Sequence, residues 1–98
     1  MSTPSFPKRD PADAAFWDLR YEADFTPWEA GIAPRDLRDF VMASPAPRSV
    51  LVPGCGSARD VRFLAAAGWE VLGLDFSPAA VAAARKVLGS HAGRARQA

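Results

Sequence analysis

The stretch Ser49-Val-Leu-Val-Pro-Gly-Cys-Gly-Ser-Ala-Arg-Asp60 predicts a buried strand, a glycine turn and the first turn of a helix. Residues 50–52 form a short apolar run with two β-branched members, which is typical of a strand covered on both faces. Pro53 cannot donate a ladder hydrogen bond, so the strand should end there. Gly54 and Gly56 permit backbone angles that other residues resist, and they let a ligand approach the main chain. This order of features is typical of a nucleotide-type α/β site.

The next segment predicts a helix and a second strand that ends in an acid. Ser57 is placed to cap the helix, Gly68 to close it, and residues 70–75 form the strand. Asp75 lies about 20 residues beyond the turn, where dinucleotide-binding folds place a carboxylate that binds a ribose. Arg59 stands where the third glycine of G-x-G-x-x-G would be, which disfavours a nicotinamide or flavin dinucleotide but leaves the ribose contact intact.

Three further helices are expected around this unit. Asp10-Pro11 predicts a helix that runs to about Tyr21 or Glu22, and a second should run from Pro34 to near Ala43. The third should run from Pro78 to Leu88, with Ser77 as its cap and Gly89 just past its end. Residues 92–98 stop where a third strand would be due.

The predicted fold class is α/β: a truncated Rossmann-like sheet of two parallel strands with flanking helices, preceded by N-terminal helices. Residues 1–47 would form a helical lid region and residues 48–98 the start of the sheet, together the N-terminal half of a single larger domain. Two strands make an unfinished sheet. Its open edge should make the chain marginal alone or favour self-association.

Composition excludes several classes of protein. The chain has 98 residues, 49% of them hydrophobic, and 12 basic against 11 acidic residues give a net charge of +1. This balance does not indicate nucleic acid or an anionic membrane as a partner. No apolar run is as long as a membrane span, and the N-terminus lacks a signal-peptide core, so a soluble cytoplasmic protein is expected. A single cysteine excludes an internal disulfide and a cysteine-based zinc cluster.

Aromatic residues form a second group of candidates. Trp17 and Tyr21 lie one helical turn apart, and Trp28 sits in a loop stiffened by Pro27. These rings could be ordinary packing, or they could form a lid over a ligand that carries a positive sulfonium, because ring faces attract cations. Gly73 is expected next to the site, where a side chain could obstruct a ligand.

The remaining reactive residues are weaker candidates. Cys55 has no base paired with it in the sequence, so a small side chain in a crowded turn is favoured over a nucleophile. His91 has no second metal ligand near it, and an exposed histidine is favoured. Asp60 could stabilise the start of its helix or reach a ligand at the turn.

Four motifs together resemble a known family. Residues 50–56 and 71–77 resemble motif I and the following acidic strand of class I S-adenosylmethionine-dependent methyltransferases. With Trp17-Asp-Leu-Arg-Tyr21 and Thr26-Pro-Trp-Glu-Ala-Gly31, the chain resembles the thiopurine S-methyltransferase superfamily, which includes thiol and halide methyltransferases. The resemblance covers most of residues 14–88.

The resemblance implies S-adenosyl-L-methionine as the cofactor. The aromatic residues would surround its sulfonium end, the glycine turn would pass under its methionine portion, Asp75 would bind the ribose and Phe76 would lie against the adenine. Tyr21 departs from the tryptophan of the plant-type members. The residues implied for cofactor binding are Trp17, Tyr21, Trp28, Gly54, Cys55, Gly56, Asp75 and Phe76.

The implied activity is methyl transfer to a small-molecule acceptor: a thiol, a halide or a thiopurine-like compound. Such a transfer needs neither a catalytic triad nor a metal, because the cofactor is already activated. Two alternatives stay open at this point: a module that binds an NAD(P)-type dinucleotide, and a non-catalytic fragment that self-associates. No residue is assigned a catalytic role.

Overall fold

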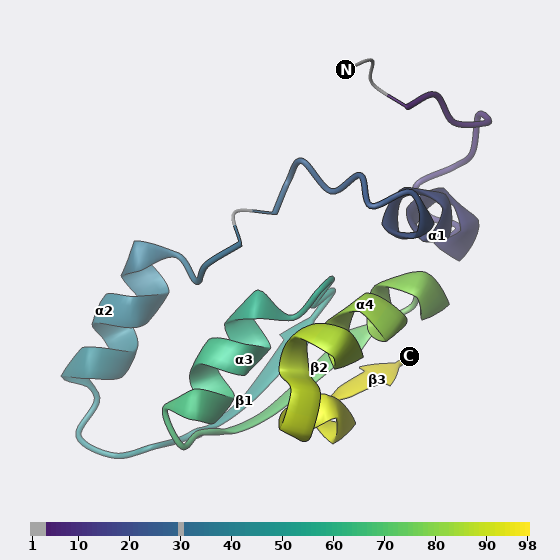
Figure 1. The fold of residues 1–98 in the computed structure, drawn as a ribbon. Coiled ribbons are helices and arrows are strands. Elements are labelled where there is room, and N and C mark those ends of the chain that lie inside the picture. The colour runs from purple at the N-terminus through teal and green to yellow at the C-terminus, as the bar shows by residue number, and fades with distance from the viewer. Residues whose placement is uncertain (1–3, 30) are drawn as a thin grey trace.

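A computed structural model describes residues 4–29 and 31–98 (Figure 1). In chain order the elements are α1 (Ala14–Glu22), α2 (Arg35–Ala43), β1 (Ser49–Pro53), α3 (Arg59–Ala66), β2 (Glu70–Asp75), α4 (Pro78–Leu88), the 3₁₀ helix η1 (Gly89–Arg94) and β3 (Ala95–Gln97). None of the described helices is long and apolar enough to cross a membrane.

The sheet has three parallel strands in the order β1-β2-β3. The α/β, Rossmann-like class is therefore confirmed, but the sheet has one strand more than the two expected. Residues 95–97 carry no β-branched side chain that would indicate a strand. They pair with β2 because Ala95 is fully buried and the Ala98 N–H donates to the carbonyl of Asp75 at 2.9 Å. Residues 95–97 form a strand because they pair with β2, which lies far away in the sequence, and not because of their own β propensity.

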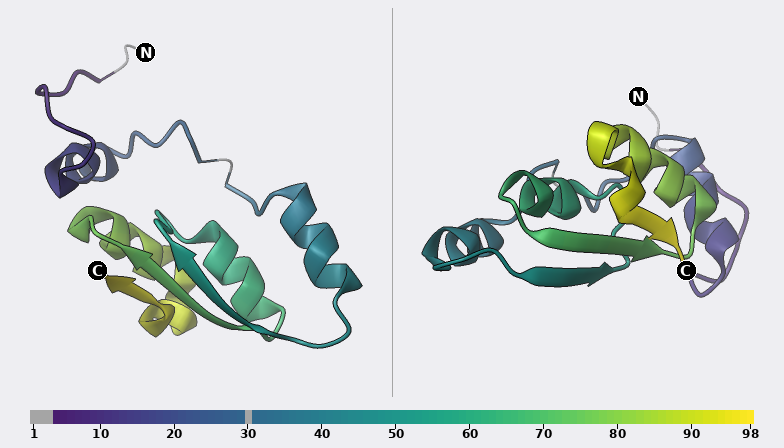
Figure 2. Two further views of the ribbon diagram at one scale, coloured as in Figure 1. Left: turned by 180° about the vertical axis from the view of Figure 1, so that it is seen from behind. Right: turned by 90° about the horizontal axis from the view of Figure 1, so that it is seen from below.

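Helices α3 and α4 cover the same face of the sheet (Figure 2). This arrangement is expected where successive parallel strands are joined by right-handed crossovers that each add a strand on the same side. Val50 and Val52 pack against the core on that face, whereas Leu51 points the other way and is 57% exposed. The expectation that the first strand is covered on both faces is therefore wrong for the described residues.

The core lies between that face and the two helices. The predicted packing face of α3 is confirmed, because Val61, Leu64 and Ala65 are all buried. The core cluster is completed by small and large apolar residues from the neighbouring elements: Ala58, Trp69, Val71, Ala84, Leu88 and Ala95. Helix α2 contributes only partly buried side chains to this cluster.

The two ends of α3 are set by backbone geometry. Ala58 precedes the helix in the left-handed region at φ 63°, and no side chain caps it. The prediction that Ser57 caps α3 is therefore wrong. At the other end, Gly68 has φ 85°, its N–H donates to Ala65 and the N–H of Trp69 donates to Leu64, which is typical of a glycine-terminated helix.

Helix α1 begins later than predicted. The side chain of Asp10 accepts from the N–H of Ala12 at 2.9 Å, and its backbone carbonyl accepts from the N–H of Asp13 at 2.8 Å, so residues 10–13 form a turn and the helix starts at Ala14. An aspartate that bonds nearby backbone N–H groups stabilises a turn as readily as it caps a helix. The predicted limits of α4, and its cap at Ser77, are confirmed.

Candidate cofactor-binding site

The glycine turn lies at the carboxyl ends of β1 and β2. Gly54 and Gly56 have φ 65° and 55°, in the left-handed region that favours glycine. Between them, the N–H of Cys55 donates to the carbonyl of Leu74 at 2.9 Å and ties the turn to the end of β2. In open α/β sheets ligands bind at this edge.

Asp75 points toward the glycine turn. Its Oδ2 accepts a hydrogen bond from the N–H of Gly56 at 3.0 Å, and its Oδ1 accepts one from the N–H of Ser77 at 3.0 Å. A carboxylate offers about four acceptor positions. Two of these are used, so the remaining lone pairs can accept from the hydroxyls of a sugar.

The aromatic candidates form one cluster in front of the turn. The ring of Trp28 meets Trp17 at 5.5 Å and 90°, and Tyr21 at 5.9 Å and 75°. Both are edge-to-face arrangements, which aromatic pairs favour. The indole N–H of Trp17 donates to the carbonyl of Pro11 at 2.7 Å and fixes that ring. Trp28 remains 46% exposed, so its ring is not a core residue.

One cavity of about 490 Å³ brings these groups together. Its wall contains all eight residues that the sequence indicated for cofactor binding: Trp17, Tyr21, Trp28, Gly54, Cys55, Gly56, Asp75 and Phe76. Two further residues, Pro11 and Glu29, also line it. Glu29 belongs to the family-like motif Thr26-Pro-Trp-Glu-Ala-Gly31, but the sequence did not indicate a role for it in the site. The sequence indicated Pro11 as the start of a helix but not as a residue of the cavity wall.

Cys55 is positioned to pack rather than to react. Burial and the negative charge of Asp75 raise the pKa of the thiol to about 11, so it stays protonated at neutral pH. A Cβ at Gly73 would come within 2.9 Å of the Cys55 sulfur and 2.8 Å of Cγ2 of Val61. The missing side chain of Gly73 therefore makes room for the protein's own packing beside the cavity-lining Cys55. That a side chain there would obstruct a ligand stays a prediction.

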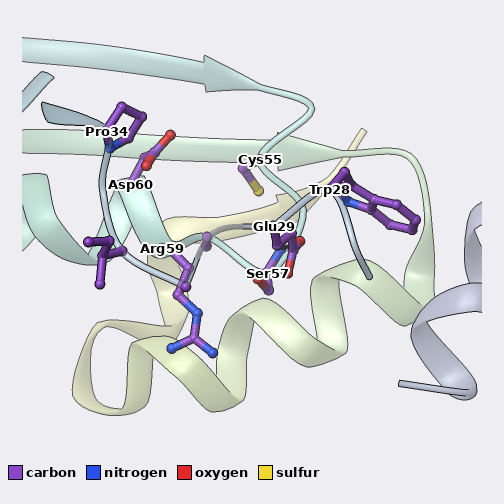
Figure 3. A pocket seen from close by; sticks show the side chains of 10 residues that line it. Trp28, Glu29, Pro34, Cys55, Ser57, Arg59 and Asp60 are labelled. Atoms are coloured by element: carbon purple, nitrogen blue, oxygen red, sulfur yellow. Dashed lines mark hydrogen bonds between the residues drawn. The ribbon is translucent and has the colours of Figure 1, made fainter. Parts of the chain in front are cut away.

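A second, smaller cavity of about 210 Å³ shares Trp28, Glu29 and Cys55 with the first. Figure 3 shows Glu29 beside Ser57, with the ring of Trp28 and the side chain of Asp60 on opposite sides of them. Asp60 lines only this smaller cavity of the two, and burial raises its pKa. Within residues 4–29 and 31–98, no group of three His, Cys, Asp or Glu side chains is arranged to hold a metal ion.

The chain resembles known proteins at the level of a family. The family model "Thiopurine S-methyltransferase (TPMT)" matches residues 12–97. Thiocyanate methyltransferase 1 of Arabidopsis thaliana is 39% identical over 75 residues, which are 76% of this chain and 33% of that protein. Probable thiol methyltransferase 2 of the same plant is 38% identical over 66 residues, or 66% of this chain and 29% of that protein.

A solved structure described as "Conversion of a Disulfide Bond into a Thioacetal Group during Echinomycin Biosynthesis" is similar in fold. It superposes with a TM-score of 0.75 and 28% identity, covering 87% of this chain and 38% of the other. The chain spans about a third of the length of the curated relatives that it matches.

Proposed function

The chain belongs to the thiopurine S-methyltransferase family, and on that premise we propose that it supplies the cofactor-binding part of a methyltransferase. The cofactor is S-adenosyl-L-methionine and the acceptor is a small molecule. In this proposal residues 1–47 act as a lid, and residues 48–98 form the start of the sheet that carries the cofactor. The relatives are about three times as long, so the activity proposed is that of the whole protein.

A single observation supports this proposal: all eight indicated residues line one cavity. The groups in that cavity fit a sulfonium nucleoside. Asp75 retains acceptor capacity for the ribose hydroxyls. A Cβ built on Gly54 meets nothing within 4 Å, so the turn offers bare backbone beside open space. The rings of Trp17, Tyr21 and Trp28 supply π faces and edges that suit a cation.

The chemistry divides between cofactor and protein. S-adenosyl-L-methionine, when bound, supplies an activated methyl group for in-line displacement by a nucleophile. The chain's own residues anchor the nucleoside, orient the methyl group and exclude water through the aromatic cluster. Because the Cys55 thiol stays protonated at neutral pH, it does not compete with the acceptor for the methyl group.

We propose a small nucleophile as the acceptor: a thiol, a halide-like anion such as thiocyanate, or a thiopurine-like compound. The matched relatives are described as thiocyanate and thiol methyltransferases. Transfer of a labelled methyl group to thiocyanate, to a simple thiol and to a thiopurine would rank these acceptors.

The first prediction tests the ribose contact. Asp75→Ala should weaken binding of S-adenosylhomocysteine by about 1–3 kcal/mol, because it removes a charged acceptor and leaves ribose hydroxyls unpaired. Isothermal calorimetry on the 98-residue chain measures this. Asp60→Ala is the matched control, since that carboxylate does not line the larger cavity. Equal affinity of the Asp75 variant and the wild type would contradict the assignment.

The same titration separates the alternative functions. A dinucleotide-binding module would prefer NADH to S-adenosylhomocysteine, although Arg59 in place of the third glycine disfavours it. A non-catalytic, self-associating fragment would bind neither. Binding of S-adenosylhomocysteine with no competition from NADH is the result that we expect.

A further inference from the structure

Glu29 receives hydrogen bonds from two separate parts of the chain. Its Oε1 accepts from the hydroxyl of Tyr21 at 2.8 Å and from the N–H of Ser57 at 3.1 Å. Its Oε2 accepts from the Ser57 hydroxyl at 2.5 Å. The carboxylate thus connects α1, the loop that carries Trp28 and the glycine turn. Figure 3 shows Glu29 and Ser57 next to each other.

The ionisation of these groups fits their roles as acceptor and donor. Burial alone would raise the pKa of Glu29, but hydrogen bonds from Ser57 and Tyr21 outweigh it, and the pKa is lowered overall. Burial and the bond to Glu29 raise the pKa of Tyr21. At neutral pH the carboxylate is therefore charged and accepts, while the phenol keeps its proton and donates.

Gly56 shows how closely this group packs on the turn. A Cβ at that position would lie 2.6 Å from the hydroxyl oxygen of Tyr21 and 2.7 Å from Oε1 of Glu29. Any side chain there would displace both groups. The absence of a side chain at Gly56 therefore serves this contact as well as the approach of a ligand.

We propose that Glu29 is a positioning residue that holds the aromatic cluster against the glycine turn. Trp28 is its neighbour in sequence and meets both Tyr21 and Trp17 edge to face. Fixing Glu29 on Ser57 and Tyr21 therefore sets where the Trp28 ring stands in the cavity wall. The consequence for ligand affinity rests on the function proposed above, whereas the placement of the loop does not.

Two neighbouring amides report on this contact. The N–H of Ser57 donates to Glu29, and the N–H of Gly56 donates to Asp75. Glu29→Ala should speed hydrogen exchange at the Ser57 amide by about tenfold, as expected for loss of a hydrogen bond, and leave the Gly56 amide within about twofold. The affinity for S-adenosylhomocysteine should fall by about tenfold, because the loop is no longer held.

Glu29→Gln tests whether hydrogen bonding or charge is responsible. A glutamine oxygen in place of Oε1 can accept from Tyr21 and Ser57, and its amide can donate to the Ser57 hydroxyl. This variant should keep the Ser57 exchange rate and the affinity within about threefold of the wild type. Glu22→Ala, at the exposed end of α1, is the matched control and should change neither.

Tyr21→Phe removes a donor to Glu29 but keeps the ring, so it tests the proposal even where Glu29→Ala fails to fold. Tyr21→Phe alone should speed hydrogen exchange at the Ser57 amide by about threefold. In the Glu29→Ala background it should add nothing, because both substitutions remove the same Tyr21–Glu29 hydrogen bond. Normal protection of Ser57 in Tyr21→Phe, or equal damage by Glu29→Gln and Glu29→Ala, would overturn the proposal. If the wild type does not bind S-adenosylhomocysteine, the proposed function fails, and the exchange rates still decide the role of Glu29.

Discussion

Gly56 has polar neighbours on two sides. Its N–H donates to Asp75, and the hydroxyl of Tyr21 and the carboxylate of Glu29 occupy the space where a Cβ would lie. The proposed ribose acid, the aromatic cluster and the turn therefore meet at one residue. Substitutions at these groups should therefore have non-additive effects on stability, because residues in contact do not contribute to it independently.

Trp28 gives the prediction that belongs at this scale. If its ring attracts a sulfonium, Trp28→Ala should weaken binding of S-adenosylmethionine about two- to fivefold more than binding of the uncharged S-adenosylhomocysteine. Calorimetric titration with both ligands measures the difference. Trp28→Phe keeps a ring face, so the difference between the losses of affinity for the two ligands should be smaller. Equal losses for the two ligands would indicate packing alone.

At the scale of elements, the site depends on how α3 and the glycine turn pack on β2. Val61 of α3 and Cys55 of the turn converge on Gly73, where a Cβ would lie 2.8 and 2.9 Å from their side chains. Because β2 ends two residues later at Asp75, a shift of the strand here would also move the proposed ribose acid.

Gly73→Ala should therefore destabilise the chain by about 1–3 kcal/mol, the usual cost of overpacking. Urea unfolding followed by circular dichroism measures the change in the free energy of unfolding. Gly93→Ala is the matched control, since a Cβ there meets nothing within 4 Å. The same unfolding midpoint for both variants would show that the side chains of Val61 and Cys55 can move to accommodate an extra methyl group at Gly73.

A second contact between elements holds α1 on the start of α4. Oδ1 of Asp18 accepts from the hydroxyl of Ser77 at 2.5 Å and from the N–H of Ala79 at 3.0 Å. A carboxylate from one helix thus satisfies the first turn of another. Figure 1 shows α1 next to α4. Since α1 carries Trp17 and Tyr21, this contact helps to place the aromatic cluster beside the glycine turn.

Asp18→Ala should cost about 1 kcal/mol of stability, as for loss of a helix cap, and should speed hydrogen exchange at the Ala79 amide. Asp13→Ala is the control, because Asp13 precedes α1 and its side chain makes no capping hydrogen bond. Unchanged protection of Ala79 would mean that α1 is held on α4 by apolar packing instead.

For the molecule as a whole, the sequence predicted what local signals determine. The limits of β2 and α4 follow from an apolar run and from a Ser-Pro cap, and both are confirmed. β3 depends on pairing with a distant strand, and the hydrogen bonds of Glu29 depend on Ser57, 28 residues away. No local pattern contains those contacts. The grouping of the eight site residues in one cavity could be anticipated only because a family pattern linked them.

One face of the sheet is left open, and the chain as a whole is elongated. The chain measures 47 × 27 × 23 Å, with a radius of gyration of 14.3 Å, against about 13 Å for a compact chain of this length. On the face away from α3 and α4, Leu51 is paired with Leu72, and Leu74 with Arg96. An apolar face next to the open edge of β1 is a surface that protein chains normally cover.

We therefore predict that the isolated 98-residue chain self-associates through this face. Sedimentation equilibrium should show an average mass that rises with concentration. Leu51→Lys should lower the association constant by about tenfold, which corresponds to about 1.4 kcal/mol, because it places a charge on the face that becomes buried. Met42→Lys is the matched control, since Met42 is 85% exposed but lies on α2, away from the sheet. A monomer at every concentration, or equal effects of the two lysines, would rule out this face as the site of association.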